Sequence, residues 1–71
     1  MELIEVEEEA RLRREDAAAR LRELADMLSR HNEVAFNREG VRYSVKVPSE
    51  VTFSLEIEIG EQSEIEIELK W

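Results

Sequence analysis

Apolar and polar residues alternate along most of the second half of this chain, and a period of two predicts β-strands. The pattern is clearest over residues 51–59 and 64–71, and it also covers 33–37 and 41–47. A shorter stretch of the same kind opens the chain at residues 1–7. Because successive side chains of a strand point to opposite faces, each segment should present one apolar and one polar face.

The period becomes helical over residues 14–30. Apolar side chains there recur three and four positions apart and form one stripe: Ala17, Leu21, Leu24, Ala25 and Leu28. Glu15 and Asp16 lie where the helix dipole favours anions, and Arg30 and His31 lie where it favours cations. We expect Arg13 as the N-cap, although its side chain is a poor capping group, and Asn32 as a left-handed stop.

Turn-forming residues separate the last four predicted strands. They lie at 37–40, where Gly40 is free to adopt a positive φ, at 48–50, which includes Pro48, and at 60–63. Loops this short join antiparallel neighbours, so these strands should form a meander. The sequence therefore predicts a single α+β domain over 1–71, with the order β-α-β-β-β-β. Its one helix should pack on the apolar face of a mainly antiparallel sheet.

Charge and composition exclude several classes of function. The chain of 71 residues has 18 acidic and 10 basic residues, a net charge of −8 at pH 7. This balance argues against binding nucleic acid or an anionic membrane, because both require clustered cations. There is no cysteine, so neither disulfides nor thiolate metal sites are expected. No apolar run is long enough to span a bilayer and no signal peptide is seen, so we expect a soluble, cytoplasmic protein.

The polar face of the last two predicted strands is almost entirely acidic. Its members are Glu56, Glu58, Glu64, Glu66 and Glu68. When the two strands pair, about three directly opposed or diagonal pairs should consist of two glutamates, and like charges in such positions are destabilising. Three explanations are open. Arg42 and Lys46 lie beside Glu56 and Glu58 while solvent screens the remaining charges, the face binds a basic protein or a second subunit, or it binds divalent cations.

Trp71 continues the apolar face of Ile65, Ile67 and Leu69. The simpler interpretation is that it caps the core beside the helix, since a small domain gains much from burying a tryptophan. The alternative is an aromatic anchor in an interface with a partner or a second subunit.

No residue pattern supports catalysis. The single histidine, His31, is expected to interact with the last carbonyls of the helix, and Tyr43 is expected in the core with its hydroxyl at the rim. The serines have no histidine base at hand, and the two glycines form no phosphate-binding loop. We therefore expect a non-enzymatic protein without catalytic residues, cofactor or metal site.

Three segments give the chain a family resemblance. They are Arg-Arg-Glu-Asp-Ala-Ala at 13–18, Leu-Arg-Glu-Leu-Ala-Asp at 21–26, and the acidic alternating strand at 64–71 that ends on Trp71. With these the chain resembles the amphi-Trp domain family of small bacterial and archaeal proteins. The resemblance implies the α+β architecture and no known activity.

The functional expectation is an acidic module that works by protein–protein interaction, as a homodimer or with a basic protein partner, through its sheet. The candidate surface consists of Glu56, Glu58, Glu64, Glu66, Glu68 and Trp71. The alternative is a domain that binds cations or a small ligand on the glutamate-rich strand face.

Overall fold

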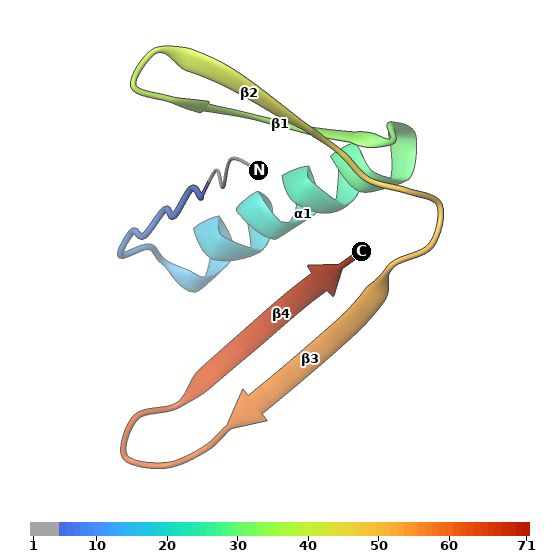
Figure 1. The fold of residues 1–71 in the computed structure, drawn as a ribbon. Coiled ribbons are helices and arrows are strands. Elements are labelled where there is room, and N and C mark those ends of the chain that lie inside the picture. Colours follow the sequence, from blue (N-terminus) through green and yellow to red (C-terminus); the bar gives the residue numbers. More distant parts are fainter. Residues whose placement is uncertain (1–4) are drawn as a thin grey trace.

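The computed structural model describes residues 5–71 and contains in that range one helix and four strands (Figure 1). In chain order they are α1 (Arg14–Arg30), β1 (Glu33–Arg38), β2 (Val41–Lys46), β3 (Thr52–Glu58) and β4 (Glu64–Lys70). The predicted α+β class and antiparallel strands are confirmed. Of the strand predicted at 1–7, residues 1–4 lie outside the described range, and residues 5–7 belong to an irregular segment that continues to residue 13.

Helix α1 has the predicted bounds, but only its start is capped as expected. Arg13 is the N-cap in an extended conformation, and its carbonyl accepts a hydrogen bond from the Ala17 N–H at 3.0 Å while its side chain makes no capping bond. The predicted left-handed stop at Asn32 is wrong. His31 ends the helix in an extended conformation, at φ −133° and ψ 150°, because the chain continues directly into β1.

Strands β1 and β2 form an antiparallel hairpin with a two-residue turn. Arg38 pairs with Val41, and between them Glu39 and Gly40 have φ values of 51° and 77°. Two successive positive φ angles match the right-handed twist of a hairpin, which explains the glycine at this position. A bond from the Val47 N–H to the Asn32 carbonyl, 2.7 Å long, extends the ladder by one step.

Strands β3 and β4 form a second hairpin, and the two hairpins do not join. The predicted continuous meander is wrong, since the described strands make two separate two-stranded sheets. No Cα atom of β3 or β4 lies within 8 Å of one in α1, β1 or β2. Pro48, which cannot donate a hydrogen bond, follows Val47 directly and ends the β2 ladder. The link over 47–51 then carries β3 to the other side of α1 (Figure 1).

Helix α1 consequently lies between two hairpins instead of on one sheet, and the core is thin. Among residues 5–71 only Val47 is buried, with 9% of its surface exposed. The Cα radius of gyration is 14.0 Å. The scaling relation for compact domains gives about 11 Å for this length. The chain is therefore less compact than its size allows.

Candidate interaction surface

The β3–β4 hairpin presents one wholly apolar face, which we call the hairpin's apolar face. Its members are the cross-strand pairs Phe53–Leu69, Leu55–Ile67 and Ile57–Ile65. Five of these six side chains are exposed, from 46% for Ile67 to 69% for Ile65, and Leu69 is half-buried. Single exposed apolar side chains are ordinary, but a continuous face of this kind marks an interaction site.

The stripe of α1 faces one end of this surface without closing on it. An open hollow of about 510 Å³ lies between them, lined by Leu21, Leu24, Ala25, Leu28, Ser29, Phe53, Ile67 and Leu69. Leu21 and Leu24 remain 52% and 36% exposed. Close packing would leave few voids larger than a water molecule. The helix therefore does not bury the hairpin's apolar face.

Trp71 lies next to a second apolar cavity of about 250 Å³. Its lining comes from all three layers: Leu24, Leu28, Val34, Val45, Val47, Leu69 and Trp71. Trp71 thus lies beside the helix, as predicted. Its side chain is nevertheless 62% exposed, so it is not the buried cap that the simpler interpretation expects. A large aromatic ring half out of the protein beside an apolar cavity is typical of an interface anchor.

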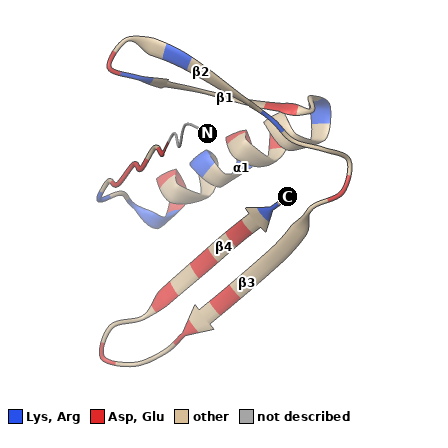
Figure 2. Ribbon diagram, viewed as in Figure 1, with Lys and Arg blue, Asp and Glu red and all other residues tan. Residues whose placement is uncertain are grey.

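The opposite side of the same hairpin is the glutamate face, formed by Glu56, Glu58, Glu64, Glu66 and Glu68. Figure 2 shows these residues as acidic bands across β3 and β4. The register sets Glu56 opposite Glu66 and Glu58 opposite Glu64, whereas Glu68 lies opposite Ser54. Two directly opposed pairs therefore form within this face.

Repulsion within this face is concentrated at Glu66. The pKa of Glu66 is raised above its ordinary value, first by a hydrogen bond with Glu64 and then by the negative charges of Glu64, Glu56 and Glu68. At the far end of the face, Lys70 Nζ lies 3.2 Å from Glu68 Oε1. This exposed ion pair contributes little and does not reach the opposed pairs.

The cations expected to relieve the repulsion lie elsewhere. Arg42 and Lys46 belong to β2, whose partner is β1, and there they face Asn37 and Glu33 across the ladder. The prediction that they lie beside Glu56 and Glu58 is therefore wrong for this chain. Its failure follows from the separation of the two hairpins.

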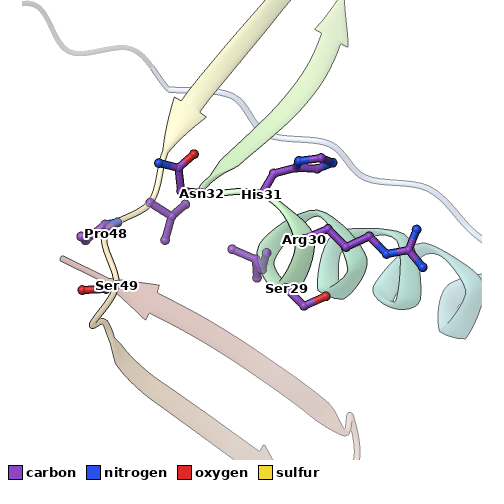
Figure 3. Close-up of a pocket in the computed structure, with 8 residues that line it drawn as sticks. Ser29, Arg30, His31, Asn32, Pro48 and Ser49 are labelled. Atoms are coloured by element: carbon purple, nitrogen blue, oxygen red, sulfur yellow. The ribbon is translucent and has the colours of Figure 1, made fainter.

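The C-terminal end of α1 carries a different, polar hollow of about 450 Å³, lined by residues 28–32 and 47–49. Figure 3 shows the side chains of Arg30 and His31 extending away from Pro48 and Ser49. The His31 backbone N–H donates a hydrogen bond to the Met27 carbonyl at 3.0 Å, which closes the last turn of α1.

Within residues 5–71 no three His, Asp or Glu side chains are grouped as a metal site would require. No helix in that range is long and apolar enough to cross a membrane.

The five glutamates lie on one face of the hairpin as predicted, but the apolar residues on its other face were not predicted as a candidate surface. Leu55, Ile57 and Ile65 were expected to be core. A signal was present, because the five stripe positions of one helix offer little area to cover four or five apolar strand faces. A comparison of the apolar area on the strands with that on the helix predicts that part of the strand faces stays uncovered.

These features define a small acidic α+β domain whose C-terminal hairpin is apolar on one side, acidic on the other, and followed by a tryptophan. The family model of the Amphi-Trp domain matches residues 1–71. The chain belongs to the Amphi-Trp domain family, a family of unknown function. No curated protein and no solved structure matches it.

Proposed function

We propose that this protein is a non-enzymatic association module, in which two copies meet through the hairpin's apolar face. The observation that carries the proposal is the exposed area. The chain exposes 7247 Å², whereas the area relation for compact monomers gives about 4,600 Å² for a mass of 8.3 kDa. A surplus of roughly 2,600 Å² remains to be covered.

The size of this surplus suits a homodimer. If each copy lost only half of its surplus, the two together would bury about 2,600 Å², within the range of obligate homodimers. Such interfaces are apolar and resemble a divided domain core. The hairpin's apolar face, the stripe of α1 and the exposed Trp71 provide that kind of surface. Domains of this length also commonly gain stability by oligomerising.

The charge distribution favours this side of the hairpin over the other. Each copy carries a net charge of −8, so two copies that met through the glutamate faces would repel each other. Contact through the apolar side keeps the glutamate faces in water. The acidic side then also discourages indiscriminate pairing of the exposed strands.

A double variant on the apolar face tests the proposal. Leu55→Thr with Ile65→Thr removes two side chains that are 55% and 69% exposed in one copy while keeping residues that favour strands. Burying each such side chain contributes about 1.5–3 kcal/mol, so the dissociation constant should rise at least about tenfold. Trp71, the only tryptophan, reports association as a blue shift of its fluorescence with rising protein concentration.

The matched control is Leu12→Thr, which removes an aliphatic side chain that is 41% exposed but lies before α1. Circular dichroism checks that both variants retain the helix. Equal dissociation constants for the wild type, the control and the double variant would contradict the proposal.

A further inference from the structure

Each hairpin is a separate two-stranded sheet in the described residues, so every one of the four strands has one unpaired edge. Strand β2 pairs only with β1, and strand β3 pairs only with β4. Both are six or seven residues long, regular and exposed. An edge of this kind is a template for another strand, and natural proteins normally cover or blunt it.

The polar faces of these two edges are complementary. On β2 the polar positions are Arg42, Ser44 and Lys46, whereas on β3 they are Thr52, Ser54, Glu56 and Glu58. The polar face of β2 therefore carries two cations, and the polar face of β3 carries two glutamates and no cation. The apolar faces also correspond, with Tyr43 and Val45 on one edge and Leu55 and Ile57 on the other.

One antiparallel register of β2 and β3 pairs opposite charges on the polar face and apolar side chains on the apolar face. If Ser44 stands opposite Glu56, then Arg42 stands opposite Glu58, and Lys46 lies diagonal to Glu56. On the other face the same register sets Tyr43 opposite Ile57 and Val45 opposite Leu55. Shifting one strand by a single residue would set apolar side chains among the glutamates, so the pattern specifies the register to within steps of two.

Resting on the self-association proposed above, we infer that β2 of one copy pairs with β3 of a second copy. Two four-stranded sheets result, each built from the first hairpin of one chain and the second hairpin of the other. The hairpin's apolar face then joins the apolar side of β1 and β2 of the second copy, which is the side where Leu24 and Leu28 of that copy's α1 lie against Val34 and Val45. The helix of the second copy thereby comes to the apolar side of the hairpin. Arg42 and Lys46 of each copy offset the repulsion among the other copy's glutamates.

Pairing between copies, and not within one, follows from the course of the chain. Residues 47–51 carry β3 to the other side of α1, and no Cα atom of β3 comes within 8 Å of β2 (Figure 1). No hydrogen bond or ion pair within residues 5–71 fastens the second hairpin to the rest of its own chain. An element held so loosely is exchanged between identical copies at low cost.

Disulfide trapping tests the inference directly, because the chain has no cysteine of its own. Ser44→Cys and Glu56→Cys are made in separate proteins, mixed and oxidised. Residues opposite each other on antiparallel strands lie within the reach of a disulfide. We expect a cross-linked heterodimer to form faster than either homodimer. The control pair is Arg22→Cys with Glu56→Cys, which joins the helix to β3 and should cross-link no faster than chance collision.

A single protein that carries both Ser44→Cys and Glu56→Cys distinguishes pairing between copies from pairing within one chain. Species of twice the monomer mass on a non-reducing gel support pairing between copies. A disulfide closed within one chain overturns the inference, because the hairpins would then pair in the same copy. A dimer seen in sedimentation without the Ser44–Glu56 cross-link also overturns it, while the proposed self-association stands. A monomer at all concentrations overturns both.

Charge exchange supplies a second test that does not depend on oxidation. One variant carries Arg42→Glu with Lys46→Glu, and the other carries Glu56→Lys with Glu58→Lys. The dimer has two junctions, at each of which β2 of one copy pairs with β3 of the other. Each variant alone should self-associate at least about tenfold more weakly than the wild type, because like charges then meet at both junctions. A mixture should recover the lost affinity, because both junctions of the mixed dimer pair opposite charges. Unweakened variants, or a mixture that does not recover, would contradict the inference.

Discussion

Glu66 illustrates how a regular strand pattern creates a local electrostatic cost. Strand alternation puts Glu64, Glu66 and Glu68 on one face, and the register adds Glu56 directly across from Glu66. A hydrogen bond with Glu64 and the surrounding negative charges raise the pKa of Glu66. The folded protein therefore holds a proton on this carboxyl more tightly than the unfolded chain does.

This raised pKa sets the sign of a pH dependence. The free energy of unfolding should increase as the pH falls from 7 through the raised pKa of Glu66, and the gain should be complete below the ordinary glutamate pKa. Glu66→Gln should raise the melting temperature at pH 7 and reduce the further gain at a pH of about 5. Thermal melts followed by circular dichroism at both pH values measure this.

Glu61→Gln is the control for this change, since Glu61 lies in the loop between β3 and β4 and faces no residue across the ladder. It should leave the pH dependence unchanged. If Glu66→Gln melts below the wild type at pH 7, repulsion is not the main effect at this position.

Calcium and sodium chlorides at equal ionic strength should raise the melting temperature equally, which would argue against a specific cation site.

At the scale of single elements, the turn of the first hairpin offers a matched pair of glycines. Gly40 has φ 77° with nothing within 4 Å of an added Cβ atom, so Gly40→Ala is strained by its backbone alone. The expected cost is about 1 kcal/mol, or a loss of about 4–8 °C in melting temperature. Gly60 has no such φ, and its added Cβ would lie at an ordinary 3.8 Å from the Gln62 carbonyl oxygen.

Gly60→Ala should therefore change the melting temperature much less than Gly40→Ala does. Thermal unfolding of both variants under the same conditions provides the comparison. Equal losses would show that the positive φ at Gly40 is not a specific requirement of the turn.

The elements were predictable from sequence because each depends on local periodicity. Helix α1 has the predicted bounds, and the four strands after it agree to within one or two residues, whereas residues 5–7 of the strand predicted at 1–7 are irregular. Pairing between elements was less predictable. The pairing of β3 with β4 followed from a short loop. The separation of β2 from β3 depends instead on where the link through Pro48 leads the chain. No local pattern records that path, so the positions of Arg42 and Lys46 relative to the glutamates were predicted wrongly.

At the scale of the whole molecule, the same limit applies to burial. The five glutamates lie on one face as predicted, since strand parity decides which side a residue occupies. Parity does not decide what covers the other side. Leu55, Ile65 and Trp71 are exposed because the two hairpins lie on either side of α1, and this arrangement does not follow from parity.

Two whole-molecule quantities agree that one chain alone is not closely packed. The radius of gyration of 14.0 Å and the exposed area of 7247 Å² both exceed what a compact chain of this mass needs. Many large apolar side chains are exposed, among them Phe53, Ile57 and Ile65 of the hairpin's apolar face. A second copy that covers the apolar side would account for both quantities.

Sedimentation equilibrium of the wild-type protein over a range of concentrations tests this most directly. The chain has a mass of 8.3 kDa. Association through the hairpin's apolar face predicts a mass that rises to twice this value with concentration and then stays constant, at both low and high salt. A mass of 8.3 kDa at every concentration would contradict the account.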